Sequence, residues 1–247
     1  MRDIKQYQDN YGLAPFEAYQ VKFRKKKILE ALSKHNHNSI LEVGCGLSSI
    51  MNDVSDFTLL DIVEPGDKFC NKAREDSMLV DSTKNVSIHN EYYELWEPGP
   101  MYNSPEFIII SSLLHEVENP LELLKKNRII SGPETVTHIN VPNARSFHRL
   151  MAVEMKLIGN VFEKSATQQK FQQYRIFDLE SLADMAEKSG FKVMESGSYF
   201  VKPFTHGQMD EMTRAGLITT EMLEGLYEME KYMPGLGSEI YINIKKV

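Results

Sequence analysis

The sequence lacks the features that mark several common protein classes. Its 247 residues include two cysteines, Cys45 and Cys70, which make neither a disulfide framework nor a zinc spacing. No stretch approaches the ~20 consecutive apolar residues that cross a bilayer, and residues 1–10 are polar where a signal peptide has an apolar core. We therefore expect a cytoplasmic protein without a membrane span.

Basic residues are fewer than acidic ones. The chain has 28 Lys and Arg against 35 Asp and Glu, a formal net charge of −7. Because binding to a phosphate backbone depends on clustered Lys and Arg, we expect no nucleic-acid partner. The one basic run, residues 24–27, falls on an amphipathic helical pattern and is interpreted as its solvated face. Histidines and carboxylates show no metal-ligand spacing, so we expect no metal.

Apolar segments and helical patterns alternate along the chain. Predicted strands cover residues 39–43, 57–63, 86–89, 107–110, 135–141, 191–200 and 239–244. Predicted helices cover residues 15–33, 67–75, 121–127, 144–158 and 178–188, and a helical segment covers residues 208–232. This alternation predicts an α/β fold with a doubly wound, mostly parallel sheet.

A glycine-containing turn follows the first predicted strand. Residues 41–49 read Leu-Glu-Val-Gly-Cys-Gly-Leu-Ser-Ser, which puts Gly44 and Gly46 where a buried strand must turn sharply. Glycines there leave backbone N–H groups open to a ligand, at the edge of the sheet where such folds bind ligands. The second strand ends near Asp61 and Glu64, at about the ~20-residue spacing of a ribose-binding carboxylate. Together these features predict a ribose-containing cofactor.

The segment from Glu42 to Ser48 resembles the first motif of class I S-adenosylmethionine-dependent methyltransferases, an acidic residue followed by alternating glycines. Ser48 stands where that motif has its third glycine. The resemblance implies a Rossmann-like, seven-stranded sheet with an antiparallel last strand. It also implies S-adenosylmethionine as cofactor and S-adenosylhomocysteine as product. The ribose would bind at the end of the second strand, the adenine after the third and the methionine end after the fourth. The expected cofactor-binding residues are Glu42, Gly44, Cys45, Gly46, Glu64 or alternatively Asp61, Glu91, Tyr92, Ser111 and Ser112.

Two alternatives from other classes stay open. A nicotinamide-dependent oxidoreductase also uses a glycine-rich turn, but its fingerprint wants a glycine at position 49, where this chain has Ser49. A cofactor-binding but inactive partner subunit is the second alternative, since Gly44, Gly46 and Glu64 argue for binding and not for turnover.

A histidine follows the fourth predicted strand. His115 falls at the rim of the expected cofactor cleft, within the segment Ser111–Pro120. Methyl transfer to a hydroxyl needs a base, and a neutral histidine suits that near pH 7. His115 is therefore the candidate catalytic residue. Packing over the cofactor, or capping the next helix, is an equally good interpretation.

Further polar residues follow the fifth strand. Asn143, Arg145 and His148 fall at the same edge of the sheet as His115. On a helix Arg145 and Arg149 would share a face that could hold a phosphate or carboxylate. The alternative is a salt-bridged helix surface.

Two more segments are expected to reach the acceptor. Tyr7 and Tyr11 lie in a polar N-terminal segment, predicted to close as a lid that excludes water. Tyr174 and Arg175 end a polar loop of the kind that carries substrate contacts or is mobile. For the tyrosines, a helix packed on the sheet is the alternative.

The segment around His115, residues 140–149 and Lys202-Pro203-Phe204 together resemble a bacterial subgroup of methyltransferases linked to surface-polysaccharide and nucleotide-sugar pathways. That resemblance implies O-methylation of a sugar or sugar-linked acceptor. The methionine-rich stretch over residues 209–233 predicts core packing or a homodimer contact.

No linker divides the chain, so we expect one domain over residues 1–247. Its parts would be a helical cap (1–34), a cofactor-binding core (35–142), and helical or loop insertions over the substrate side (143–177 and 204–235).

Overall fold

The computed structural model describes residue 4 and residues 16–164 and 173–247. The strands are β1 (Ser39–Val43), β2 (Leu59–Val63), β3 (Asn85–His89), β4 (Phe107–Ser111), β5 (Val136–Pro142), β6 (Phe191–Tyr199) and β7 (Glu239–Lys246). The α-helices are α2 (Glu17–Leu32), α3 (Asp67–Ser77), α4 (Pro120–Ile130), α5 (Phe147–Glu154), α7 (Leu179–Lys188), α8 (His206–Arg214) and α9 (Thr220–Glu228). Short 3-10 helices are η1 (Ile50–Asn52), η2 (Leu114–Glu116) and η3 (Met229–Lys231). Within the described ranges, no helix has both the length and the apolar character that crossing a bilayer requires.

The strands form one sheet in the order β3-β2-β1-β4-β5-β7-β6. Neighbours from β3 to β5 run parallel, and β7 runs antiparallel to both β5 and β6. The predicted doubly wound sheet of seven strands, mostly parallel with an antiparallel last strand, is confirmed. The chain winds outward from β1 in one direction and then from β4 in the other. Open α/β sheets bind ligands at this switch point.

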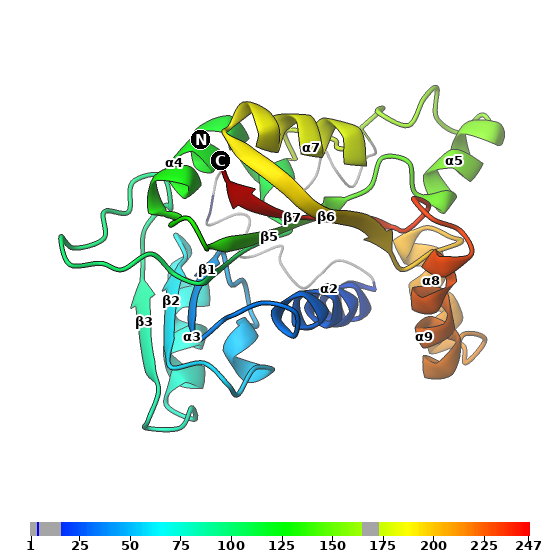
Figure 1. Cartoon of the computed structure of the whole chain (residues 1–247). Helices are drawn as coiled ribbons and strands as arrows, with labels where there is room; N and C mark the ends of the chain where they lie inside the picture. Colours follow the sequence, from blue (N-terminus) through cyan, green and yellow to red (C-terminus); the bar gives the residue numbers. More distant parts are fainter. Residues whose placement is uncertain (1–3, 5–15, 165–172) are drawn as a thin grey trace.

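Helices cover both faces of the sheet (Figure 1), which explains why its central strands are continuously apolar. In β4, Ile108 and Ile110 pack in the cluster that contains α4 and α7 side chains. Phe107 and Ile109 pack in the opposite cluster, with side chains from α2 and α3. The strand therefore buries both of its faces and anchors the centre of the sheet.

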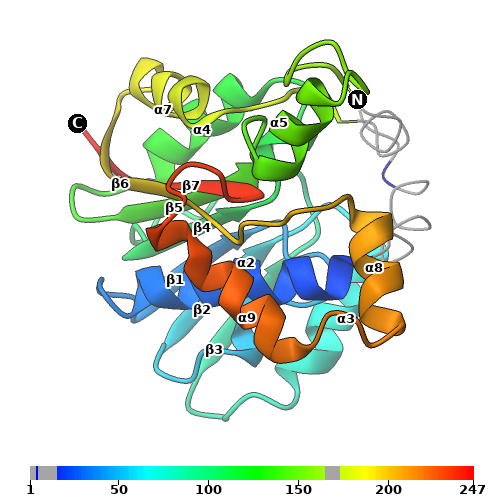
Figure 2. The ribbon, with the colours of Figure 1, turned by 90° about the vertical axis from the view of Figure 1, so that its right-hand side faces the viewer.

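A third apolar cluster joins the last two helices to the first. Figure 2 shows α9 crossing α2, with α8 at one end of α2. Phe23 of α2 stacks on Phe200 with ring centroids 4.4 Å apart, and on Tyr227 of α9 at 5.3 Å. Outside this cluster, Lys26 pairs with Glu224 at 2.9 Å. The segment after β6 is thereby held against α2.

Two helix predictions were wrong in their extent, while every predicted strand boundary lies within two residues of the observed one. The helix expected over 144–158 is α5, which starts later because the Asn143 side chain accepts a hydrogen bond from the Arg145 N–H and forms a turn. The segment expected over 208–232 is two α-helices and η3. Gly216 takes a left-handed φ of 70° after α8, and the Thr219 hydroxyl caps α9.

Candidate active site

A cavity of about 1000 Å³ opens at the carboxyl ends of the parallel strands. Its walls come from the loops after β1, β2, β4 and β5, from α2 and α5, and from the segment between β6 and α8. The volume is at the upper end of the roughly 300–1,000 Å³ usual for small-molecule sites, so the cavity has room for a nucleoside cofactor and a second small molecule.

The loop after β1 depends on two glycines. Gly44 has a φ of 78° and Gly46 a φ of 55°, both in the left-handed region that disfavours a Cβ atom. Below the loop, the buried Glu42 carboxylate accepts hydrogen bonds from the Ser49 hydroxyl and from the Ile50 N–H at 3.1 Å. Burial raises the pKa of Glu42 to about 6, against the opposing effect of these hydrogen bonds. The loop is thus tied to the strand, and Gly44, Gly46 and the neighbouring cysteine line the cavity.

The two acidic candidates of the second strand have different surroundings. Glu64 lines the cavity, and its carboxylate accepts hydrogen bonds from the N–H groups of Gly66 at 2.8 Å and Gly46 at 3.4 Å. Asp61 lies inside β2, and its carboxylate contacts Nε2 of His89 at 2.9 Å. Of the two carboxylates, only Glu64 belongs to the described cavity wall.

The ends of β3 and β4 contribute three of the four residues expected there. Half-buried Tyr92 lines the cavity, whereas Glu91 is exposed and lies outside the described wall. Ser111 and Ser112 both line the cavity. Ser112 has a φ of 52°, a conformation that costs a non-glycine residue about 1–3 kcal/mol and that clusters at functional sites.

Asn140 of β5 supports this strained serine. Its side-chain oxygen accepts hydrogen bonds from the Ser112 N–H at 3.0 Å and the Ser111 hydroxyl at 3.1 Å. The backbone carbonyl of Asn140 accepts from the same Ser112 N–H at 2.9 Å. The end of β4 is therefore held by its neighbouring strand.

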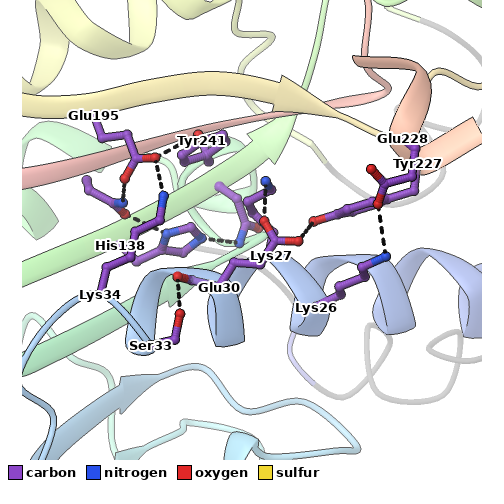
Figure 3. A network of polar contacts seen from close by, with 12 residues as sticks. Lys26, Lys27, Glu30, Ser33, Lys34, His138, Glu195, Tyr227, Glu228 and Tyr241 are labelled. Carbon is purple, nitrogen blue, oxygen red and sulfur yellow. Dashed lines mark hydrogen bonds and ion pairs between the residues drawn. The ribbon is translucent and has the colours of Figure 1, made fainter. Parts of the chain in front are cut away.

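Asn140 is in turn part of a chain of hydrogen bonds that runs across the sheet to the exposed Lys34. Figure 3 labels His138, Glu195 and Lys34 of this chain. Its amide nitrogen lies 3.2 Å from Nε2 of His138, whose Nδ1 lies 2.7 Å from the Asn243 side-chain oxygen. The Asn243 amide donates to Glu195 at 3.0 Å, and Lys34 pairs with Glu195 at 2.8 Å. Burial lowers the pKa of His138 to about 4, so the ring is neutral and suits one donor and one acceptor contact. Every member of the chain has a partner, which makes it a rigid support for the cavity edge.

His115 lies in η2, directly after β4, and is 2% exposed. It lines the cavity, and its Nε2 lies 3.7 Å from a carboxylate oxygen of Glu116. Its carbonyl accepts hydrogen bonds from the N–H groups of Tyr174 at 2.9 Å and Arg175 at 3.2 Å. The loop that ends at these two residues therefore fixes the backbone of His115.

The other residues expected to bind the acceptor divide between the cavity and the surface. His148 of α5 lines the cavity. Asn143 lines it too, but its amide donates to the carbonyls of Gly235 at 3.0 Å and Gly237 at 2.8 Å, so it holds that loop in place. Arg145 precedes α5, is exposed and pairs with Asp178 at 3.2 Å. The helical face expected for Arg145 and its neighbour four residues on does not form.

Tyr174 and Arg175 lie outside the described cavity wall and reach the site through their backbone N–H groups. Tyr7 and Tyr11 fall outside the described residues, as does most of the polar loop before Tyr174.

Several polar residues of the wall were missed by the sequence-based predictions. The interpretation of residues 24–27 as a solvated face was wrong at its start, because Arg24 and Lys25 line the cavity. Arg24 bridges two carboxylates, Glu239 at 2.9 Å and Glu17 at 2.7 Å. Lys202 also lines the cavity and is fully buried. The signal for Arg24 was its place on an amphipathic helix; nothing local marks Lys202 as buried.

Comparison with known proteins gives a family for most of the chain. The chain matches the family model of a methyltransferase domain over residues 16–196. No protein of curated function matches the sequence.

Solved structures of similar fold cover nearly the whole chain. The N-methyltransferase NodS from Bradyrhizobium japonicum WM9, in complex with S-adenosyl-L-homocysteine, has a TM-score of 0.58 at 9% identity and covers 92% of this chain and 87% of its own. A SAM-dependent methyltransferase from Thermotoga maritima has a TM-score of 0.58 at 16% identity. The match covers 94% of this chain and 92% of the other. Magnesium protoporphyrin IX methyltransferase from Synechocystis PCC 6803, with bound SAH, has a TM-score of 0.56 at 10% identity. The match covers 93% of this chain and 84% of the other. At these identities the likeness concerns the fold.

Proposed function

The chain belongs to the methyltransferase-domain family, and from that membership we propose that it transfers the methyl group of S-adenosylmethionine to a small polar acceptor. Membership of this family disfavours the nicotinamide-dependent alternative. The observation that carries the proposal is the left-handed loop at Gly44 and Gly46, open toward a cavity whose wall also holds the Glu64 carboxylate. The residues of this end of the cavity fit a nucleoside with a charged amino-acid tail.

Each cofactor contact is assigned from its place in the wall. Glu64 binds the ribose hydroxyls, because its carboxylate is buried, oriented by two backbone N–H groups and placed at the end of β2. Tyr92 packs beside the adenine, and Ser111 and Ser112 face the methionine end. Glu42 and Cys45 shape the glycine loop. Asp61 and Glu91 have no role in this assignment, since both lie outside the described wall.

S-adenosylmethionine, when bound, supplies a methyl carbon made electrophilic by its sulfonium. The protein's part is to align the acceptor oxygen with that carbon and to exclude water. His115 accepts the proton of the acceptor hydroxyl at a ring nitrogen as the oxygen–carbon bond forms. The products are a methyl ether, S-adenosylhomocysteine and a protonated His115, which returns its proton to solvent. The hydrogen bonds to its carbonyl hold the backbone of His115 at the cavity edge.

The acceptor that we favour is a sugar or a sugar-linked nucleotide. Lys202, His206 and Ser238 are among the polar residues of the wall, and they offer hydrogen-bond partners to a hydroxyl-rich molecule. An amine acceptor is the second candidate, because one of the similar structures is described as an N-methyltransferase.

Calorimetric titration tests the cofactor assignment. We expect saturable binding of S-adenosylhomocysteine and no binding of NAD or NADP. Binding of a nicotinamide cofactor alone would overturn the proposal.

Turnover with a panel of nucleotide-sugars and small amines tests the chemistry, and separates an enzyme from an inactive partner subunit. His115→Gln is expected to bind S-adenosylhomocysteine within about twofold of the parent while its kcat falls by the roughly 10²–10⁴ that a general base contributes. His35→Gln, outside the described cavity wall, is the matched control. Unchanged turnover in His115→Gln would remove His115 as the base.

A further inference from the structure

Lys202 is buried in an unusual way. Its side chain is 0% exposed, and its Nζ has no hydrogen-bond partner among the described residues. An ammonium buried without a partner is costly, so proteins keep one where a ligand completes it or where it loses its proton. Lys202 lines the cavity, which makes a ligand from the cavity the natural partner.

The two carboxylates that act electrostatically on Lys202, Glu239 and Glu17, are already hydrogen-bonded to other side chains. Glu239 accepts from Arg24 at 2.9 Å and from the Tyr199 hydroxyl at 3.3 Å, and Glu17 accepts from Arg24 at 2.7 Å. Arg24 pairs with both of these carboxylates, and no described carboxylate lies within 4.0 Å of the Lys202 ammonium. Burial lowers the pKa of Lys202 to about 7, although Glu239 and Glu17 oppose the shift.

The backbone before Lys202 is bent into this position. Phe200 has a φ of 59°, a rare conformation for a bulky side chain. Its ring stacks on Phe23, and its carbonyl accepts a hydrogen bond from the Ser238 N–H at 2.8 Å. Strain that packing maintains in this way is typical of functional sites.

Other groups of the same wall also lack partners within the described chain. They are Nδ1 of His148 and the hydroxyl of Ser238, a residue that is 5% exposed. His206 lies beside them, with its Nε2 3.1 Å from the Gln20 amide. Burial and the charge of Lys202 lower the pKa values of both histidines well below their usual range.

The charged and titratable groups that face Lys202 come from four elements. Arg24 and Glu17 belong to α2, His148 and Arg149 to α5, His206 to α8 and Glu239 to β7. The carboxylates among them, Glu17 and Glu239, both pair with Arg24, and neither contacts the Lys202 ammonium directly. Within the described chain the ammonium therefore lacks a hydrogen-bonded partner, which a group entering from the cavity could supply.

We propose that Lys202, His148 and Ser238 form a subsite for an anionic group of the acceptor, a phosphate or a carboxylate. Such a group carries the oxygen acceptors that a protonated Lys202 amine, the Ser238 hydroxyl and a neutral His148 ring with its proton on Nδ1 all need. Its charge would compensate Lys202, and its binding would draw a proton into the site. The assignment of this anion to the methyl acceptor rests on the proposed function; the anion site itself does not.

Calorimetry on protein saturated with S-adenosylhomocysteine tests the subsite, with inorganic phosphate in one arm and acetate in the other. Phosphate is expected to bind saturably. Whichever of phosphate and acetate binds more tightly shows whether the subsite prefers a phosphate or a carboxylate. Titration with acetate, which is fully ionised at pH 7, in two buffers of different ionisation enthalpy should show uptake of about half a proton per site near pH 7, because Lys202 is half protonated there before binding. Lys202→Met is expected to weaken binding by about tenfold or more, as loss of a charge-assisted hydrogen bond does. Ser238→Ala should weaken it by a few-fold, and Lys188→Met, on the surface, should leave it unchanged.

Binding of neither anion, or binding that Lys202→Met leaves intact, would overturn the subsite. Once an acceptor is known, Lys202→Met should raise its KM much more than it lowers kcat. A fall in kcat at constant KM would make Lys202 a base instead and would also overturn it. Failure of S-adenosylhomocysteine to bind counts against the proposed function; the anion titration is then run on the free protein and still decides the subsite.

Discussion

Replacing Lys202 by methionine is expected to stabilise the protein at neutral pH. The amine is buried without a hydrogen-bond partner among the described residues, and Glu239 and Glu17 offset its desolvation only in part, so its pKa falls from 10.5 to about 7. The folded protein therefore binds fewer protons than the unfolded chain between these two values. Its free energy of unfolding must rise with pH across that window. Methionine has a similar length and no charge, so Lys202→Met removes this dependence.

The magnitude follows from the size of the pKa shift. At about 1.36 kcal/mol per unit, the shift corresponds to an upper limit of roughly 5 kcal/mol below pH 7. Relaxation and water entry reduce the penalty of a buried charge, so we expect a gain of about 2–5 kcal/mol at pH 7. The gain should shrink toward about 1–3 kcal/mol near pH 10, where a neutral amine is still left without a hydrogen bond.

Urea unfolding, followed by the fluorescence of the single tryptophan, Trp96, measures this difference. Trp96 is buried, so its emission reports global unfolding. The series runs from about pH 6 to pH 10 in buffers without phosphate, since a bound anion would stabilise the parent protein. Lys188→Met is the control, because Lys188 is exposed and pairs with Asp184 on the same helix; its effect should stay within about 0.5 kcal/mol.

Two results would refute the reasoning. A less stable Lys202→Met protein at pH 7 would mean that the ammonium is compensated in the folded state. A stability gain that stays constant from pH 6 to pH 10 would mean that packing, and not charge, produces it. Either result would also remove the main physical support for an anion subsite.

Two further predictions concern the cofactor end and the loop behind the acceptor wall. Glu64→Gln should weaken S-adenosylhomocysteine binding by about 10–100-fold, as loss of a charged hydrogen-bond acceptor does. Asp61→Asn should change that binding by less than about twofold. If calorimetry finds the larger loss in Asp61→Asn, the ribose is assigned to Asp61 instead. Gly237→Ala should lower stability by about 1–3 kcal/mol in urea unfolding, because its Cβ would lie 2.3 Å from the Tyr199 backbone nitrogen and force that loop away; a variant as stable as the parent would show that the loop yields easily.

The strands and the glycine loop could be predicted because their signals are local. A strand buried on both faces is a continuous apolar run, and a left-handed turn needs glycine, so both leave a mark in the residues themselves. The carboxyl edge followed from the same reasoning, since Val43, Val63 and His89 lie in register at the ends of adjacent parallel strands.

Helix interruptions were harder to predict. The two-helix break at Gly216 and the late start of α5 depend on single turns, and apolar periodicity continues across both. Periodicity reports which face of a helix is buried and is insensitive to one residue that leaves the helical conformation.

By itself the sequence determined the α/β class, the strand positions and the glycine turn, because each depends on the properties of neighbouring residues. Tertiary structure alone decided between Glu64 and Asp61 in the wall, put Arg145 on the surface, and enclosed Lys202. A lysine has the same local signature whether it is solvated or buried. Its burial depends on α2, α5 and β7 closing around it, and these elements are far apart in the sequence and meet only in the folded protein.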